Sequence, residues 1–264
     1  RAALRMTLKV AAIDAFSTEP LGGNGATVVL LEQPAESPWM QRLAAEFNQS
    51  ETAFLWCFQG RWYLRWFTPS CEVKLCGHAT LAASLALHHW QQLPIGTAQQ
   101  LQTRSGPLRV ELQSSTSAAI DLPSGGLKLR SKEPWMQPFQ PLQQWTSDLG
   151  YGVLLLDSSA DLQQLNPDEP CWANTSENAW VVMQPGSRGC DYQLRFFAPG
   201  LGLREDPVTG SAHALVAPWW CEQLGQTTVS GWQPSHRPGG LCCEPLSSGM
   251  IRLIGDGVIL WDGV

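Results

Sequence analysis

Charge and long apolar runs are both scarce in this 264-residue sequence, and each shortage excludes a class of protein. Charged residues make up 15% and hydrophobic residues 44%; this balance excludes a disordered chain or a coiled coil. No apolar run approaches the roughly 18 residues that cross a bilayer, so we expect no membrane span. The 17 basic and 23 acidic residues give a net charge of −6 without a basic cluster, which argues against nucleic acid as a partner.

The sequence also lacks a Cys-x-x-Cys pair and an apolar signal core at its start. Its eight unevenly spaced cysteines are therefore expected to be reduced thiols of a cytoplasmic protein. Cys71, Cys76 and His78 do not have the spacing of a zinc site, and no second Cys/His pair completes them, so we predict no metal. Met6 is the expected native start, preceded by an added segment or a trimmed leader.

Three short motifs recur in the same order in the two halves of the chain. The matching pairs are 48–54 with 174–180, 65–69 with 195–199, and 76–79 with 209–212. Their shared order and slowly drifting offset indicate a duplicated α/β unit. The turn-rich segment 121–132 is the natural boundary, which predicts an N-terminal domain at 6–122 and a C-terminal domain at 123–264.

Hydrophobic periodicity predicts several strands and one principal helix in each half. Strands are expected at 8–15, 26–31, 52–58, 62–67 and 108–112. The almost wholly apolar segments 78–90 and 210–224 are expected to be helices with strands wrapped around them, the second kinked or ended by Pro218. A surface helix at 38–47 is expected to have Ser37 as its cap. The predicted fold class is therefore α+β, with a mixed sheet around a central helix in each half.

Each apolar helix begins at a strand-turn junction that carries a glycine, Gly77 in the first half and Gly210 in the second. Free backbone N–H groups and the helix dipole make each junction a socket for an anion. If the halves face each other across a pseudo-twofold axis, the two sockets converge on one cleft, which suits a small carboxylate or an enolate oxygen. The alternative is that the glycines only permit close helix packing, and their repetition favours the functional interpretation.

Glu51 is the first candidate for acid–base chemistry, because it ends a turn that enters a buried strand, where desolvation raises a carboxyl pKa. A structural hydrogen bond, which the repeat-equivalent Glu177 could also make, is the open alternative. His78, in the first helical turn, is expected to be held neutral by the dipole and to donate or accept a proton, with a purely structural histidine as the open alternative. His213 is a weaker candidate. Asp206 either belongs to the site or caps the following helix.

The segments 50–52, 67–69, 75–80 and 205–212 together resemble the PhzF family of phenazine-biosynthesis-like proteins over nearly the whole chain. The resemblance implies the diaminopimelate-epimerase-like fold: two pseudo-twofold-related domains, each a mixed sheet or barrel around a central helix, a cofactor-free site between them, and commonly a homodimer. It also implies that Glu51 shuttles a proton and that His78 and Asp206 are further catalytic residues. Donors at the glycine turns would bind the substrate carboxylate, which gives the expected substrate-binding set Cys76, Gly77, Thr209, Gly210 and Ser211.

The chain departs from two patterns within this superfamily. Phenazine-pathway members carry Ala-Gly-His-Pro where this chain has Cys-Gly-His-Ala at 76–79, the form typical of relatives without an assigned substrate. The related racemases place a cysteine at both turns, whereas Thr209 stands at the second turn here, and its hydroxyl is far too weak a base. We therefore predict a cofactor-independent isomerase of a small carboxylic acid, with proton transfer through Glu51. The alternatives are a cysteine-dependent epimerase or racemase that uses Cys76, and a non-catalytic carboxylate-binding protein of the same fold.

Overall fold

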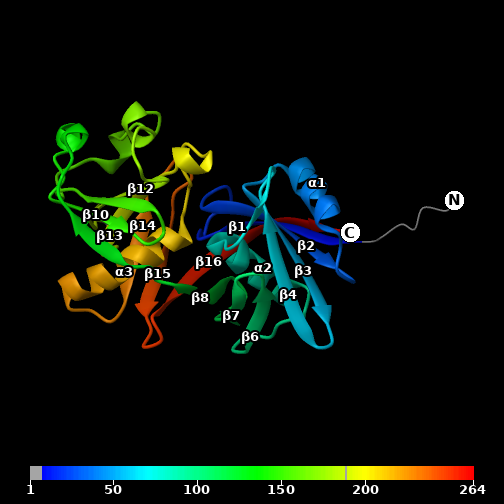
Figure 1. The fold of residues 1–264 in the computed structure, drawn as a ribbon. Helices are drawn as coiled ribbons and strands as arrows, with labels where there is room; N and C mark the ends of the chain where they lie inside the picture. Colours follow the sequence, from blue (N-terminus) through cyan, green and yellow to red (C-terminus); the bar gives the residue numbers. More distant parts are fainter. Residues whose placement is uncertain (1–7, 188) are drawn as a thin grey trace. The chain divides into compact units, whose positions relative to one another are not determined.

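The structure is a computed structural model that describes residues 8–187 and 189–264. The chain folds into two compact units (Figure 1). Unit 1 comprises the described residues up to Asp121 together with Gly255–Val264, and unit 2 comprises Leu122–Ile254. The predicted second domain ran to residue 264, whereas the final segment packs with unit 1. The expected start at Met6 lies outside the described residues.

Unit 1 is built from a ring of strands and two helices, α1 (Ser37–Phe47) and α2 (Gly77–His89). Its strands are β1 (Lys9–Ala15), β2 (Asn24–Leu31), β3 (Glu51–Phe58), β4 (Arg61–Phe67), β5 (Glu72–Val73), β6 (Ala98–Thr103), β7 (Gly106–Leu112), β8 (Ser117–Pro123) and the last part of β16 (Met250–Gly263). The order β1-β2-β3-β4-β6-β7-β8-β16 returns to β1, so the described strands close an eight-stranded barrel. The sheet is mixed, because β2–β3 and β4–β6 are parallel pairs.

Unit 2 repeats the same pattern of strand pairing. Its elements are β9 (Leu127–Arg130), η1 (Pro134–Phe139), β10 (Gln143–Ser147), β11 (Tyr151–Leu155), η2 (Leu162–Gln164), η3 (Pro170–Trp172), β12 (Ala179–Pro185), β13 (Tyr192–Phe197), η4 (Pro199–Leu201), α3 (Gly210–Leu224), β14 (Val229–Gln233), β15 (Gly239–Pro245) and the first part of β16. The order runs from β9 through β15 to β16, and the parallel pairs are β11–β12 and β13–β14. These two pairs correspond to β2–β3 and β4–β6 of unit 1.

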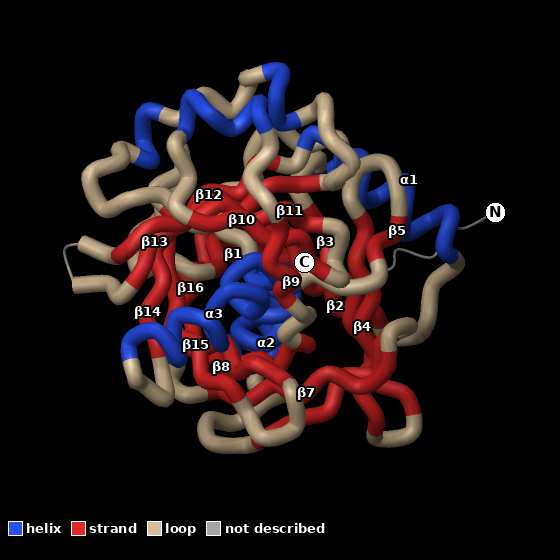
Figure 2. The backbone as a smooth tube through the Cα atoms, turned by 60° about the vertical axis from the view of Figure 1, so that its left-hand side comes forward, coloured by secondary structure: helices blue, strands red, loops and turns tan. Residues whose placement is uncertain are grey.

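Helix α2 has no polar face, and the strands of unit 1 cover it on several sides. Every residue from His78 to Leu87 is buried. The helix contacts β1, β2, β3 and β7, and Figure 2 shows it in blue against the red strands. Strand β16 carries Gly257, where a Cβ atom would lie 2.5 Å from the Leu85 side chain. The strands can therefore approach the helix closely, and the predicted burial of α2 is confirmed.

The predicted strands and helices are all present, with ends shifted by at most two residues. Ser37, however, does not cap α1: the N-cap residue is Glu36, and the Ser37 hydroxyl accepts a hydrogen bond of 2.7 Å from Arg65. Helix α3 does not end at Pro218 but continues past it. The segment 121–132, expected to be a linker, holds the end of β8 and all of β9. These local errors arise because tertiary contacts override local turn preferences.

One prediction from composition is confirmed: all eight cysteines lie in the described ranges and are free thiols. Trp172 and Trp180 are fully buried in the core of unit 2 with Met136 and Phe197. None of the described helices is long and apolar enough to cross a membrane.

Both units contain the same ion pair at corresponding strands. In unit 1, Arg65 donates two hydrogen bonds of 2.7 Å to the two carboxylate oxygens of Glu72. In unit 2, Arg195 donates bonds of 2.6 and 2.7 Å to Glu205. Each guanidinium also lies over the phenylalanine two residues further on, 5.1 and 4.9 Å from the ring centroid. Arg195 donates in addition to two carbonyls at η2, so its charge holds several segments of unit 2 together.

We expect Glu205→Ala to lower the free energy of unfolding by roughly 3–5 kcal/mol, because breaking a buried pair leaves the Arg195 charge uncompensated. The two side chains are only 6% and 5% exposed. Glu72→Ala should lower the free energy of unfolding by less, because the pair of Arg65 and Glu72 is more exposed. Urea denaturation measures both effects. Asp168→Ala, in the exposed pair with Arg204, is the control and should leave the midpoint almost unchanged. A wild-type midpoint in Glu205→Ala would contradict this role.

Candidate active site

The first glycine turn joins β5 to α2. Cys76 is the N-cap residue and has extended backbone, with φ −147° and ψ 112°. It forms no side-chain capping bond, so the backbone N–H groups that open α2 at Gly77 have no side-chain cap. These donors and the positive end of the helix dipole are the features that bind anions at a helix N-terminus.

Three of the predicted residues, Glu51, Cys76 and His78, meet at this turn. Glu51 Oε2 lies 2.9 Å from His78 Nε2, and Cys76 Sγ lies 3.4 Å from His78 Nδ1. Ser50 Oγ lies 3.1 Å from the same Nε2 and donates a hydrogen bond of 2.8 Å to the Gly25 carbonyl. Because Glu51 begins β3, which pairs with β2, the sheet fixes the carboxylate beside the helix.

Burial and mutual charge shift the pKa of all three groups. Burial raises the pKa of the Glu51 carboxyl, but the charge and hydrogen bond of His78 outweigh it, and the pKa lies below its usual value. Burial disfavours the charged form of His78 as well, yet Cys76 and Glu51 together raise its pKa well above the usual value. Burial raises the pKa of the Cys76 thiol to about 11. The lowered pKa of Glu51 and the raised pKa of His78 favour a carboxylate beside an imidazolium.

Two predictions about these groups are wrong in sign. From the sequence, where each residue is considered alone, we expect a raised pKa for Glu51 and a neutral His78. A helix dipole opposes a cation at its N-terminus by about 0.3–1 kcal/mol, whereas opposite charges 4 Å apart attract by about 4 kcal/mol at an effective dielectric constant near 20. The contact between Glu51 and His78 is shorter than that, at 2.9 Å. Each residue is thus the counterion of the other.

The same three side chains are the described residues that could hold a metal ion. One donor atom from each of Glu51, Cys76 and His78 lies within 4.8 Å of the others. An oxygen, a sulfur and a nitrogen form a set that suits zinc. A metal would have to displace the protons that His78 and Cys76 carry at neutral pH. That the protein needs no metal stays a prediction.

The second glycine turn, residues 206–211, leads into α3. Thr209 is the N-cap residue with extended backbone, and its hydroxyl donates a hydrogen bond of 2.6 Å to Asp206 Oδ2. Asp206 thus holds the residue before the helix and is not the helix cap. Ser211 Oγ lies 3.3 Å from the hydroxyl of Tyr151, a residue that the sequence analysis did not single out.

Gln233, at the end of β14, also binds the second turn. Its carboxamide accepts a hydrogen bond of 3.0 Å from the Thr209 backbone N–H and donates one of 2.6 Å to the Asp206 carbonyl. The side chain is fully buried. The sequence analysis missed Gln233 because it stands 24 residues beyond Thr209 in a strand without a motif.

Glu177, the repeat-equivalent of Glu51, has different partners. Its Oε1 atom lies 2.9 Å from an Arg130 guanidinium nitrogen and accepts a hydrogen bond of 3.1 Å from the Thr146 hydroxyl. The position that matches His78 is occupied by Ser211, which cannot become a cation. The same glutamate position therefore serves an arginine pair in unit 2 and a histidine pair in unit 1.

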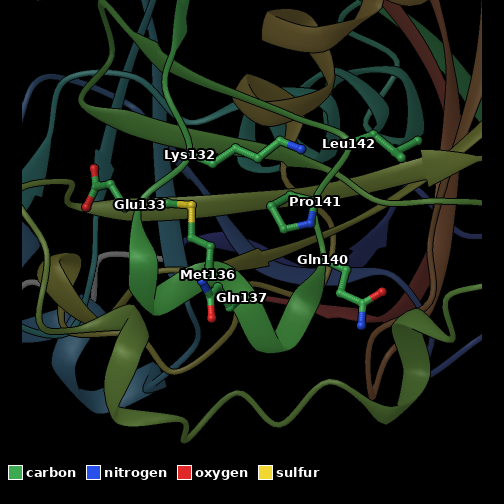
Figure 3. Close-up of a pocket in the computed structure, with 7 residues that line it drawn as sticks. All are labelled: Lys132, Glu133, Met136, Gln137, Gln140, Pro141 and Leu142. Atoms are coloured by element: carbon green, nitrogen blue, oxygen red, sulfur yellow. The ribbon is translucent and has the colours of Figure 1, made fainter.

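A separate pocket of about 310 Å³ lies beside η1 in unit 2 (Figure 3). It is lined by Lys132, Glu133, Met136, Gln137, Gln140, Pro141 and Leu142. No predicted catalytic or substrate-binding residue is among them, so this pocket is distinct from the glycine turns.

Comparison with known proteins identifies the family. Residues 13–263 match the PhzC-PhzF family, described as phenazine biosynthesis-like protein. An uncharacterized isomerase of Pseudomonas aeruginosa is 35% identical over 98% of both chains. The human phenazine biosynthesis-like domain-containing protein is 30% identical over 98% of this chain and 99% of its own. The chain therefore belongs to the PhzC-PhzF family, and it is an isomerase whose substrate is unassigned.

Solved structures agree with this assignment. A PhzF-family protein of Enterococcus faecalis superimposes with a TM-score of 0.89 at 30% identity, covering 98% of each chain. A hydroxyproline epimerase of Agrobacterium vitis gives a TM-score of 0.64 at 10% identity, covering 98% of this chain and 92% of its own, which shows the fold alone. The mixed sheet with its barrel thus belongs to the same fold family as this epimerase.

The pair of Glu51 and His78 should make stability depend on pH on two sides. Because the pKa of Glu51 is lowered, its contribution is complete above the usual value of 4.5 and is lost as the pH falls through the lower folded value. Because the pKa of His78 is raised, its contribution is complete below the usual value of 6.5 and is lost as the pH rises through the higher folded value. The pair should therefore stabilise most between pH 4.5 and 6.5.

Thermal unfolding of wild type and His78→Gln across this range and beyond it measures the effect. His78→Gln should remove the loss of stability on the alkaline side, because glutamine does not titrate. An alkaline limb of equal size in the variant would show that another group is responsible.

Proposed function

We propose that the protein is a cofactor-independent isomerase of a small carboxylic acid, in which Glu51 moves a proton between two carbon atoms of the substrate. The supporting observation is the buried contact of 2.9 Å between Glu51 Oε2 and His78 Nε2, beside a helix N-terminus without a side-chain cap. The contact keeps Glu51 as a carboxylate at neutral pH, which is the form that accepts a proton.

The proposed reaction consists of two proton transfers. The Glu51 carboxylate takes a proton from a substrate carbon, and the electron pair of that C–H bond passes into an enolate-like anion. The neutral Glu51 carboxyl then returns the proton to a second carbon, so protons and electrons balance. The imidazolium of His78 and the backbone donors at Gly77 stabilise the negative charge, which passes from Glu51 to the substrate and back. This stabilisation is needed because a carboxylate with a lowered pKa is a weak base.

We assign carboxylate binding to the glycine turn of each unit. In unit 1 the binding residues are Cys76 and Gly77, and in unit 2 they are Thr209, Gly210 and Ser211. Asp206 orients the second turn by accepting a hydrogen bond from the Thr209 hydroxyl. Helix N-termini suit this task because their N–H groups and dipole favour an anion.

The finer features of the fold belong to the same proposal. Two duplicated halves, each with a sheet around a central helix, are supported by the repeated strand pairing and by the repeated pairs of Arg65 with Glu72 and Arg195 with Glu205. The homodimer and the cytoplasmic location stay predictions.

Glu51→Gln should lower the rate of proton exchange by roughly 10² to 10⁴ or more, because glutamine cannot accept the proton. The measurement is incorporation of solvent deuterium into a panel of small carboxylic acids, followed by mass spectrometry. Glu177→Gln is the matched control, since it removes the same charge at the repeat-equivalent position. It should alter stability and leave exchange per folded molecule unchanged. Equal losses of exchange in the two variants, in proportion to unfolding, would contradict the role of Glu51.

Cys76→Ser tests the rival reaction, in which a thiolate is the base. Because burial raises the pKa of the Cys76 thiol to about 11, the thiolate is a minor species at neutral pH. We expect Cys76→Ser to keep deuterium exchange within about tenfold of wild type, since a serine hydroxyl can still contact His78 but cannot act as a base there. If Cys76→Ser abolishes exchange while Glu51→Gln retains it, the protein is a cysteine-dependent epimerase or racemase.

A further inference from the structure

We infer that Gln233 is a positioning residue that fixes the second glycine turn as a rigid anchor for the substrate, while the proton chemistry is confined to the first turn. The inference rests on the proposed function, in which the second turn binds a carboxylate and the first turn carries the proton chemistry. It goes beyond that function by giving the two turns different tasks and by naming the residue that makes the second one rigid.

Both the oxygen and the nitrogen of the Gln233 carboxamide form hydrogen bonds with the second turn. Its oxygen accepts the Thr209 backbone N–H at 3.0 Å, and its nitrogen donates to the Asp206 carbonyl at 2.6 Å. The nitrogen also lies 3.4 Å from the Thr209 hydroxyl oxygen. One side chain therefore spans the turn from its first residue to the residue that caps α3. We call these two hydrogen bonds of Gln233 the clamp. An amide suits this position because it donates and accepts at once without carrying a charge.

The strand that carries Gln233 packs closely against α3 and β13. Gly231, two residues earlier in β14, has no room for a side chain: a Cβ atom would lie 2.5 Å from His213 Nδ1 and 2.6 Å from the Tyr192 hydroxyl oxygen. His213 lies in the first turns of α3, fully buried, with Nδ1 2.8 Å from that hydroxyl. Burial lowers the pKa of His213 to about 3, partly offset by Gln233, so the ring is neutral. His213, a candidate for chemistry from sequence, thus supports the clamp.

Unit 1 has no equivalent clamp among its described residues. The pairing of β6 with β4 corresponds to the pairing of β14 with β13, and in this alignment Leu101 corresponds to Gly231. Thr103, two residues after Leu101, therefore corresponds to Gln233. The Thr103 hydroxyl donates to the Gly106 carbonyl at 2.6 Å within the hairpin of β6 and β7, away from any glycine turn.

The first turn is held instead by the ion pair of Glu51 and His78. That pair must change its protonation during the proposed reaction, whereas the amide of Gln233 does not titrate. The two repeats have therefore kept one backbone geometry but hold it by different chemistry. A fixed second turn binds the substrate equally before and during proton transfer, which is uniform binding and affects KM more than kcat.

Gln233→Met is the test, because methionine has nearly the same shape as glutamine and forms neither hydrogen bond. It removes the acceptor of the buried Thr209 N–H and the Gln233 donor to the Asp206 carbonyl, which weakens the turn. Gln144→Met is the matched control: Gln144 is 1% exposed in the same unit, and neither atom of its amide has a hydrogen-bond partner among the described residues.

Two measurements are made on the full chain. Hydrogen exchange of the Thr209 amide, followed by NMR, should become about tenfold faster or more in Gln233→Met and stay unchanged in Gln144→Met. With the acid found in the deuterium screen, KM should rise about tenfold or more in Gln233→Met while kcat changes less than about threefold. Both parameters should stay at their wild-type values in Gln144→Met.

The outcomes separate the inference from the proposed function. Unchanged exchange of the Thr209 amide in Gln233→Met overturns the clamp, whatever the protein catalyses. Faster amide exchange with an unchanged KM, or a loss confined to kcat, overturns the division of tasks. A wild-type protein that exchanges no acid in the screen overturns the proposed function and the anchoring of substrate with it, and the amide exchange then still decides whether Gln233 holds the turn.

Discussion

The enclosure of α2 is the constraint on which the organisation of unit 1 depends. Every residue of α2 from His78 to Leu87 is buried, and the helix contacts β1, β2, β3 and β7, which belong to the barrel. The backbone groups of the helix satisfy one another except at its ends. The backbone groups that remain free to bind a ligand are therefore those at the first turn, where Cys76 and His78 lie. An imidazolium there is buried and opposed by the dipole, and the carboxylate of Glu51 compensates for both effects.

The two units share a pattern of strand pairing but differ in their side chains. The pairs formed by Arg65 with Glu72 and by Arg195 with Glu205 have kept the same bidentate geometry, because a buried guanidinium without a carboxylate is costly. The helix starts differ, with His78 in the first turn of α2 and Ser211 in the first turn of α3.

Sequence reasoning predicted the elements that depend on periodicity and failed where one side chain depends on a distant one. The apolar run that begins near His78 shows a buried helix by itself, and the glycine turns show its start. The charge state of His78 depends on Glu51, which lies on another element, so no local pattern predicts it. Ser37 has the chemistry of a cap, but the guanidinium of Arg65, 28 residues away, competes for its hydroxyl. Gln233 carries no local signal, because an isolated glutamine in a strand is typical of a solvated position.

The return of the chain to unit 1 at β16 has a consequence for the order of folding during synthesis. Ile13 in β1 pairs with Ile259 in β16, so the first strand lacks one of its neighbours until the last strand has been made. At about 5–20 residues per second, the roughly 250 residues between them take about 12–50 s to translate. During this time the barrel of unit 1 has an open edge, the kind of edge that pairs with other chains. Unit 2, which is contiguous from Leu122 to Ile254, has all its strands before unit 1 does. Unit 2 begins later in the chain than unit 1, but it can complete its sheet earlier.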